Sequence, residues 1–350
     1  MNDSILQEDI EQIVHSNIPF DQLSGCTIFV TGATGLIGSL LVKSLLRANM
    51  LLHTDICVVA LVRNLEKAKN IFSDHLNTDR LSFCEGDIVH SIQYAGKIDY
   101  IMHGANSTDS KFFVSNPVDT IMTTVNGTRN ILEFAREKQI QGMIFLSSLE
   151  IYGIPDGQSE LISENQYGYI DPLAVRSSYS EGKRMAECLC VSYAQQYHVP
   201  VKIARLAQTF GAGVSYNDPR VFADFARSVI EKRNIILHTK GKTVRSYCYT
   251  SDAIRAILFL LLRGETAEAY NVTNMKTAIS ISDMAHMVCD LFPESGSIVE
   301  YDIPKEIHSF GYNPEMIIRL DSSKLVTLGW QAQIDLQEMF RRLISSMRDM

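Results

Sequence analysis

Two residues that can carry acid–base chemistry stand four positions apart in the YSEGK stretch at residues 179–183. Residues four apart lie on one face of a helix, so the phenol of Tyr179 and the ammonium of Lys183 would be neighbours. A nearby ammonium can lower the pKa of a phenol, which makes the phenol a usable general base. A second Tyr and Lys at this spacing, Tyr301 and Lys305, enclose Pro304, which argues against a helix there. We therefore expect Tyr179 and Lys183 to be catalytic; an ordinary surface helix is the alternative.

A hydroxyl and a carboxylate follow an apolar run in the sequence LSSLEIYG at residues 146–153. If this stretch stays extended, Ser148 and Glu150 share a face and Leu149 points away. Ligands of open parallel sheets bind at the carboxyl ends of the strands, so both side chains would lie at a ligand site. A hydroxyl beside Tyr179 would hold a reacting hydroxyl group, and Glu150 would place a carboxylate further along the ligand. We expect Ser148 and Glu150 to be catalytic; capping of the following loop is the alternative for Glu150.

Three glycines in the sequence GATGLIG at residues 32–38 follow a short apolar run and precede a helical pattern. In a strand–turn–helix unit they would allow a tight turn, a close approach of the backbone to a pyrophosphate, and close packing of helix on strand. The helix N-terminus adds free N–H groups and a positive dipole for the phosphates. A plain turn is the alternative, but the placement on the first strand favours a dinucleotide site, where Lys183 would also bind the nicotinamide ribose. The loop residues expected at the dinucleotide are Gly32, Thr34, Gly35, Leu36, Ile37 and Gly38.

The residue expected at the adenosine ribose is basic rather than acidic. NAD-binding proteins of this kind usually place Asp or Glu at the end of the second strand, where it holds the 2′-hydroxyl. This chain has Arg63 there. Arg63, together with Lys67, could meet a 2′-phosphate and favour NADP, and a solvated Arg63 that stacks on the adenine is an equal alternative. Asp87 and Ile88, after the third strand, are placed beside the adenine, although Asp87 could equally be a turn residue.

Strands and helices alternate at the spacing of a parallel sheet covered on both faces. We predict strands at 26–31, 56–62, 81–85, 100–103, 143–147 and 201–206, and helices at 40–48, 65–73, 117–137 and 178–197. Beyond Gly211 the predicted elements are shorter: helices at 221–232, 252–262, 282–291 and 336–347, and a strand at 269–272.

The predicted fold class is therefore α/β: a Rossmann-type doubly wound parallel sheet with a smaller mixed C-terminal substrate domain. We divide the chain into a helical extension at 1–24, a dinucleotide-binding domain at 25–210 and a mainly substrate-binding domain at 211–350. Some segments of the last part are expected to return to the Rossmann sheet.

Composition excludes several classes of function. The 350 residues carry 32 Lys and Arg against 40 Asp and Glu, which gives a net charge of −8. The sequence therefore lacks the basic charge that is typical of nucleic-acid-binding proteins. The most apolar run, 253–262, is too short to span a membrane and contains Arg255, and the first twelve residues do not resemble a secretory signal. The seven scattered cysteines fit reduced core thiols in the cytoplasm, and no His or Cys spacing predicts a metal site.

Together these motifs resemble the extended short-chain dehydrogenase/reductase superfamily, specifically its nucleotide-sugar epimerases, dehydratases and decarboxylases. The resemblance spans about Cys26 to Trp330, nearly the whole chain. It rests on the glycine motif, the strand end at 146–153 and the Tyr179–Lys183 pair. The segments VNGT at 125–128, ARLAQTFG at 204–211 and VRSY at 244–247 add support. The combination is specific, whereas the later segments are individually weak.

The resemblance implies a reaction on a nucleotide-diphosphate sugar through a transient 4-keto sugar. Ser148 would join Tyr179 and Lys183, and Tyr179 would remove the proton from the sugar C4 hydroxyl as hydride passes to the nicotinamide. Hydride then returns, so the cofactor, expected to be NAD, is regenerated. The cofactor contacts implied beyond the glycine motif are Gly104, Ala105 and Asn126.

The groups around sugar C5 and C6 decide which product forms. Related 4,6-dehydratases commonly place Asp-Glu where Leu149 and Glu150 stand, and Leu149 cannot serve as an acid. Glu150 matches the Glu of UDP-glucuronate decarboxylases, and the NDPRVF segment at 217–222 resembles a segment that lines their substrate site. The resemblance therefore favours a UDP-glucuronate decarboxylase-like reaction, with 4-epimerase and 4,6-dehydratase as alternatives.

Two departures from the family pattern concern the ligands. Gln208 replaces the usual Asn near the substrate diphosphate, and the region of Arg63 lacks the acid typical of NAD binding. Arg220 and Arg245 are candidates for the diphosphate, because Arg pairs bidentately with phosphate oxygens; surface ion pairs are the alternative. The expected substrate contacts are Ser148, Gln208, Arg220, Val221 and Arg245.

In this superfamily two helices, here 117–137 and 178–197, pair with their symmetry mates into a four-helix bundle, which implies a homodimer. A function of another class, a non-catalytic NAD(P)-binding redox sensor, is suggested by the LVRNLEKA run at 61–68. The presence of Ser148, Tyr179 and Lys183 argues against it.

Overall fold

The structure, a computed structural model, describes residues 3–155, 160–303 and 315–349. Its main feature is a seven-stranded sheet of order β3-β2-β1-β4-β5-β6-β10, in which every neighbouring pair is parallel. The strand order reverses between β1 and β4, which is where ligands of such sheets bind. The predicted Rossmann-type doubly wound sheet is confirmed. Its strands are β1 (Thr27–Thr31), β2 (Cys57–Val62), β3 (Leu81–Glu85), β4 (Tyr100–His103), β5 (Gly142–Ser148), β6 (Val201–Leu206) and β10 (Ala269–Val272).

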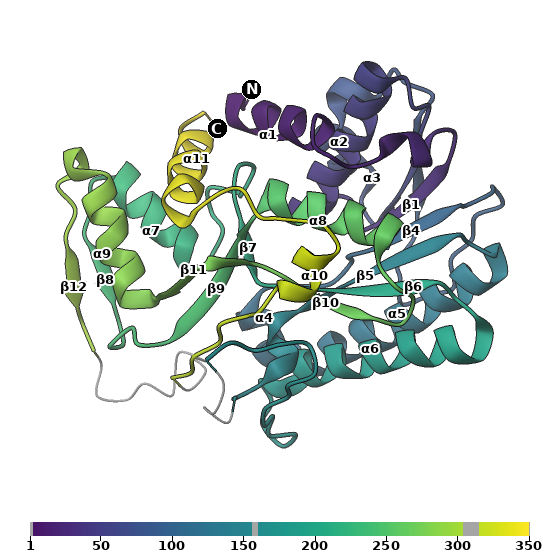
Figure 1. The fold of residues 1–350 in the computed structure, drawn as a ribbon. Helices are drawn as coiled ribbons and strands as arrows, with labels where there is room; N and C mark the ends of the chain where they lie inside the picture. Colours follow the sequence, from purple (N-terminus) through teal and green to yellow (C-terminus); the bar gives the residue numbers. More distant parts are fainter. Residues whose placement is uncertain (1–2, 156–159, 304–314, 350) are drawn as a thin grey trace.

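Helices cover both faces of this sheet, so its central strands are largely buried and mostly apolar (Figure 1). On one face a single core joins the sheet to α1 (Ser4–Val14), α2 (Leu36–Leu52) and α8 (Thr250–Arg263). On the other face a second core lies under α5 (Pro117–Lys138) and α6 (Ser177–Tyr197), which pack against each other. Helix α3 (Leu65–Ile71) follows β2, and the short α4 (Ser110–Ser115) precedes α5.

A smaller lobe with its own core lies beside the sheet, at the left of Figure 1. It holds a three-stranded sheet of β7 (Gln208–Phe210), β9 (Val244–Tyr249) and β11 (Asn274–Ser280), and a parallel pair of β8 (Ile235–Leu237) and β12 (Val299–Tyr301). Helices α7 (Val221–Ile230), α9 (Ile281–Leu291) and α11 (Leu336–Arg348) complete this core, and α10 (Ser323–Thr327) contacts β10. The described residues include the 3₁₀ turns η1 (Phe20–Leu23), η2 (Ser73–His75), η3 (Leu149–Tyr152) and η4 (Pro293–Ser295).

The sequence did not predict the strands of the smaller lobe. Three of them, β7, β8 and β12, have only three residues each, too few for a period-two pattern to be recognised. Tyr301, part of the second Tyr-Lys match, ends β12 and is not helical, while Lys305 lies outside the described residues. The domain boundary at 210 stays a prediction, since β7 pairs with β9 and β10 returns to the large sheet beside β6.

The two ends of the chain meet where α1 lies against α11 (Figure 1). Asp9 of α1 is buried there, where its carboxylate accepts hydrogen bonds from Arg342 Nη2 at 2.9 Å and from Tyr249 Oη at 2.7 Å. Burial raises the pKa of Asp9 to about 6. Since α1 also contacts α2 and α8, the predicted helical extension links the large sheet to the smaller lobe.

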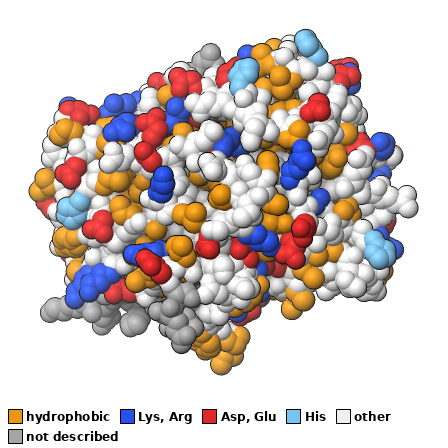
Figure 2. Space-filling view, viewed as in Figure 1, with side chains coloured by type: hydrophobic (Ala, Val, Ile, Leu, Met, Phe, Trp, Pro, Cys, Tyr) orange, Lys and Arg blue, Asp and Glu red, His pale blue; other side chains and the backbone are white. Residues whose placement is uncertain are grey.

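On the face drawn in Figure 2, Lys and Arg side chains are interspersed with Asp and Glu. Within the described ranges no helix has both the length and the apolar character needed to cross a bilayer. Across the same ranges, no group of three or more His, Cys, Asp or Glu could hold a metal ion.

Candidate active site

A cavity of about 650 Å³ opens at the carboxyl edge of the large sheet, where the strand order reverses. It brings the glycine motif and the Tyr179–Lys183 pair, far apart in the sequence, to one place. The predicted site residues that line it are Gly32, Thr34, Gly35, Leu36, Ile37, Gly38, Arg63, Asp87, Ile88, Gly104, Ala105, Ser148, Glu150, Tyr179, Lys183, Gln208 and Arg220. Three others do not line it: Asn126, Val221 and Arg245.

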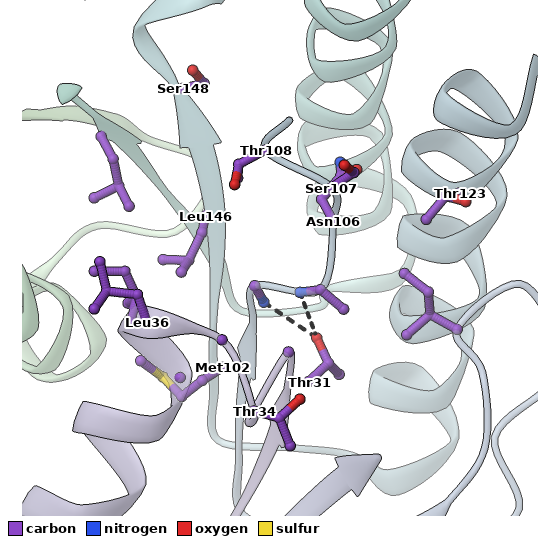
Figure 3. A pocket seen from close by; sticks show the side chains of 18 of the residues that line it. Thr31, Thr34, Leu36, Met102, Asn106, Ser107, Thr108, Thr123, Leu146 and Ser148 are labelled. Carbon is purple, nitrogen blue, oxygen red and sulfur yellow. Dashed lines mark hydrogen bonds between the residues drawn. The ribbon is translucent and has the colours of Figure 1, made fainter. Parts of the chain in front are cut away.

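The glycine loop forms the floor of the cavity and is tightly packed. Gly32 has φ +70°, and a Cβ on it would lie 2.9 Å from backbone atoms of Gly104 and Ala105. A Cβ on Gly38 would overlap the backbone of Gly32. Thr31 ties the two loops together, because its Oγ1 accepts hydrogen bonds from the N–H groups of Gly104 and Ala105 at 3.2 and 3.1 Å (Figure 3).

These residues fit a dinucleotide. Helix α2 begins beside the cavity with Gly35 as its N-cap and no side-chain cap, which leaves N–H groups of the first turn for phosphate oxygens. Asn106, after β4, donates its Nδ2 to Thr124 at 2.8 Å, but its buried Oδ1 has no partner among the residues that the structure describes. A buried acceptor without a donor is costly, so a ligand N–H or hydroxyl is its natural partner.

Replacing Gly32 with Ala is expected to lower NAD affinity at least about 10-fold, because the left-handed residue is strained and the Gly104–Ala105 backbone must move. Gly25→Ala is the matched control: Gly25 has φ +69° but open space around its Cβ position. Titration of NAD by protein fluorescence measures both variants. Equal affinities for the two would show that the close approach at Gly32 does not matter.

His103, at the end of β4, lies between Thr31 and Thr128. Its Nδ1 lies 2.8 Å from Thr31 Oγ1 and its Nε2 lies 3.2 Å from Thr128 Oγ1. Burial, followed by the charge of Lys183, lowers the pKa of His103 to about 3, so the imidazole is neutral in the folded protein.

Protonation of His103 is therefore expected to favour unfolding in acid. The unfolded histidine takes up a proton below about pH 6.5 and the folded one does not, so stability falls as the pH drops, by roughly 2 kcal/mol from pH 7 to pH 5. Urea denaturation of the wild type and His103→Asn at both pH values measures this contribution. If the two proteins lose the same free energy of unfolding between pH 7 and pH 5, the account of His103 is wrong.

At the adenosine end of the cavity the residue after β2 is basic and accessible. The side chain of Arg63 is 78% exposed, and its Nη1 lies 3.6 Å from Asp87 Oδ2. Asn64, which follows, caps α3 by accepting a hydrogen bond from the Lys67 N–H at 2.8 Å. No acidic residue therefore stands directly after β2 to hold a ribose 2′-hydroxyl.

Tyr179 and Lys183 lie on the buried face of α6. The ring of Tyr179 stacks on Phe113 with centroids 4.3 Å apart, and Ser148 is close enough to lower the pKa of its hydroxyl. The ammonium of Lys183 donates to the Leu146 carbonyl at 2.7 Å and lies 5.9 Å from the Tyr179 ring centroid.

The pKa of Tyr179 differs from the expectation that a nearby ammonium lowers it. Burial and then the charge of Glu150 raise the pKa of Tyr179, while Ser148 and Arg176 lower it by smaller amounts. The pKa of Lys183 falls to about 8 because its ammonium is buried. The phenol is thus held neutral by its surroundings.

The segment after Ser148 is not extended, which corrects the sequence-based expectation. Residues 149–152 form the 3₁₀ turn η3, and the Glu150 N–H donates to Ser148 Oγ at 3.2 Å. Leu149 is buried, and Glu150 lines the cavity despite the turn. The carboxylate of Glu150 is fixed by two donors that the sequence did not reveal: Arg176 Nη2 at 2.9 Å and Ser180 Oγ at 3.2 Å.

The predicted diphosphate ligands occupy different places. Arg220 lines the cavity and forms an ion pair with Asp218, with Nη2 2.6 Å from Oδ2. Arg245, on β9, lies near Glu150 rather than on the cavity wall, and burial lowers its pKa. Val221 is the first residue of α7, and the exposed Asn126 directs its amide to Met122.

Sequence reasoning missed a polar rim along the loop after β4 and on α5. Because β4 adjoins β1 in the sheet, the polar residues that follow it share the carboxyl edge with the glycine loop. The GANST sequence after the strand carried that signal. The residues concerned are Asn106, Ser107, Thr108 and Thr123 (Figure 3).

A family model decides the relationship. The model described as the NAD dependent epimerase/dehydratase family matches residues 28–273, which is most of the chain. The chain belongs to this family. The resemblance drawn from the sequence motifs is thereby confirmed.

Relatives with curated names agree with that assignment. UDP-glucuronic acid decarboxylase 6 of Arabidopsis thaliana is 29% identical over 90% of this chain and 87% of its own length. UDP-glucuronic acid decarboxylase 1 of Xenopus tropicalis is 27% identical over 92% of this chain and 72% of its own.

Among solved structures, UDP-glucuronic acid 4-epimerase from Bacillus cereus has a TM-score of 0.74 at 20% identity, covering 92% of this chain and 99% of its own. That structure holds UDP-glucuronic acid and NAD. UDP-glucose 4-epimerase from Thermotoga maritima has a TM-score of 0.75 at 19% identity, with the same two coverages. These likenesses show that the fold of this family extends over nearly the whole chain.

Proposed function

We propose that the chain is a nucleotide-diphosphate-sugar enzyme that works through a transient 4-keto sugar, and that its reaction is the decarboxylation of UDP-glucuronate. The observation that carries the proposal is the placement of Glu150. Its carboxylate is fixed on the cavity wall close to Tyr179, as the resemblance to decarboxylases requires. The curated relatives named above support the same substrate.

In this proposal NAD supplies a hydride acceptor that later returns the hydride to C4. Tyr179, after it has released its own proton to solvent, takes the proton of the C4 hydroxyl and gives it back at the end, and Ser148 is one of the groups that lower its pKa. Lys183 donates to the Leu146 carbonyl, which holds its ammonium 5.9 Å from the Tyr179 ring centroid. With C4 oxidised, the C5–carboxyl bond breaks, CO2 leaves, and the electron pair passes to the C4 carbonyl before C5 is protonated.

A panel of nucleotide sugars tests the reaction. We expect UDP-glucuronate, incubated with the protein and NAD, to give a product lighter by one CO2 in the mass spectrum, and UDP-glucose to keep its mass. If UDP-glucuronate keeps its mass, the decarboxylase proposal is wrong. If no sugar in the panel changes in mass or in NMR spectrum, the catalytic proposal fails and a redox sensor is favoured instead.

Epimerisation at C4 is the second candidate, since it needs only the Ser148, Tyr179 and Lys183 cluster that the structure assembles. Its product has the same mass but a different proton spectrum. Dehydration at C5 and C6 is less supported, because the Leu149 position, where the acid of a dehydratase would stand, is apolar and buried.

NAD is the cofactor that the family uses, and we propose that NADP also fits this chain. Arg63 is exposed at the cavity rim and its contact with Asp87 is long, so its guanidinium can turn to a 2′-phosphate. Arg63→Ala should weaken NADP binding roughly 10-fold or more, because a charge-assisted hydrogen bond is lost, and leave NAD binding within about 3-fold. Titration with both cofactors measures this; equal effects on the two would contradict it.

A homodimer through α5 and α6 is a further proposal. Both helices carry exposed apolar side chains of the kind that a four-helix bundle would bury. Sedimentation at equilibrium should give twice the chain mass, and a monomer would refute the dimer. The exposed apolar side chains of α5 and α6 are Val118, Ile121, Met122, Met185 and Val191.

The cysteines are free, which agrees with the proposed cytoplasmic location.

A further inference from the structure

Arg176 stands immediately before α6 and pairs with the Glu150 carboxylate. Glu150 lines the cavity and Arg176 does not. Arg176 Nη2 lies 2.9 Å from Glu150 Oε1, and the two side chains are only 17% and 18% exposed. A charge-assisted pair that is largely shielded from water is stronger than a surface ion pair.

The second oxygen of the same carboxylate is also held. Ser180 Oγ donates to Glu150 Oε2 at 3.2 Å. Tyr179 and Ser180 follow Arg176 by three and four residues at the start of one helix, so each lies on the side of the helix that Arg176 faces. The helix that carries the proposed base therefore also fixes the orientation of Glu150.

Arg176 is itself positioned by the aromatic ring that holds Tyr179. Its guanidinium carbon lies 5.0 Å from the centroid of Phe113, and Phe113 stacks on Tyr179 with ring planes 10° apart. Its buried Nε has no hydrogen-bond partner in the part of the chain that the structure describes. Packing and the pair with Glu150, rather than a saturated hydrogen-bond set, thus place this side chain.

The charged side chains near the Tyr179 phenol shift its pKa in opposite directions. Glu150 raises the pKa of Tyr179 and Arg176 lowers it. The other charged groups that face this cluster are Lys183 on α6 and Arg245 on β9, and neither forms an ion pair with Glu150 within 4.0 Å in the described residues.

We propose that Arg176 is a positioning residue that holds the Glu150 carboxylate in the cavity beside Tyr179. This inference rests on the proposed function. Arg176 acts through Glu150 and not by contact with the sugar.

Arg176→Gln is expected to lower kcat about 10- to 100-fold with UDP-glucuronate and to change KM less than about 3-fold, since Arg176 itself does not contact the sugar. Arg176→Lys should recover part of kcat, because a cation returns. Arg233→Gln, which breaks exposed pairs with Asp224 and Glu231 far from the cavity, should keep wild-type rates.

A double-mutant cycle separates positioning from general loss of structure. In a protein that already carries Glu150→Gln, adding Arg176→Gln should lower kcat by less than a further factor of about 3, because the carboxylate that Arg176 holds is already gone. Independent, multiplying losses of kcat would overturn the proposal.

A crystal structure of Arg176→Gln distinguishes this inference from the proposed function. We expect the Glu150 carboxylate to be turned away from Tyr179 in that variant. A carboxylate in its wild-type place would refute the positioning role even if the enzyme decarboxylates UDP-glucuronate. If the carboxylate is displaced in Arg176→Gln but the wild-type protein does not decarboxylate UDP-glucuronate, the positioning role is supported and only the proposed reaction is refuted.

Discussion

Replacement of Tyr179 by Phe is expected to lower turnover of the nucleotide sugar by about 10³-fold, in the range that a general base contributes. The phenylalanine ring can keep the stacking on Phe113, so the fold and the cavity should persist. NAD should still bind within about 3-fold of the wild type, since the glycine loop and α2 are untouched. Single-turnover kinetics and a fluorescence titration of NAD measure the two effects.

Tyr197→Phe is the matched control for that variant. Tyr197 ends the same helix, is exposed and lies far from the cavity, so its turnover should equal the wild type. Wild-type turnover in Tyr179→Phe would remove Tyr179 from the chemistry, and loss of NAD binding in that variant would mean that its defect is not specific to proton transfer.

The largest effect on stability is expected from Arg205→Met. Arg205, on β6, is almost fully buried, with Nη2 2.7 Å from Glu187 Oε2 and Nη1 3.0 Å from Tyr152 Oη. Glu187, on α6, also accepts a hydrogen bond from Ser147 on β5. Loss of the arginine leaves a buried carboxylate without its cation, which costs about 3–5 kcal/mol of the free energy of unfolding.

Two further variants make the Arg205 prediction sharp. Adding Glu187→Met to Arg205→Met should restore part of the loss, because no buried charge then remains unpaired. Arg341→Met, which removes an exposed ion pair with Glu338, should cost less than about 1 kcal/mol. Urea denaturation measures all of them, and an Arg205→Met protein as stable as Arg341→Met would contradict the role given to this network.

The large sheet and the core of the site could be predicted because local pattern and chemistry agree there. Strands such as β3, β4 and β6 are continuous runs between clear turns, and their observed bounds equal the predicted ones. The glycine motif, Tyr179 and Lys183 were recognisable because their spacing is set by backbone geometry and helix periodicity. The fold then brings them into one cavity.

Other features of the site depend on contacts that cannot be predicted from the local sequence pattern. The turn at η3 follows from the bond between Glu150 N–H and Ser148 Oγ, which competes with an extended backbone. The pairing of Arg176 with Glu150 joins residues 26 positions apart. The raised pKa of Tyr179 comes from burial, which only the packed structure can give.

The most direct test of the account is the fate of a label at the oxidised carbon. UDP-glucuronate carrying deuterium at C4 should give, with NAD and the wild-type protein, a product that has lost CO2 and still carries deuterium at C4. That result requires oxidation at C4, decarboxylation and return of the same hydride within one site. A product that has lost the deuterium would contradict the return of the hydride, and unchanged UDP-glucuronate would contradict the reaction itself.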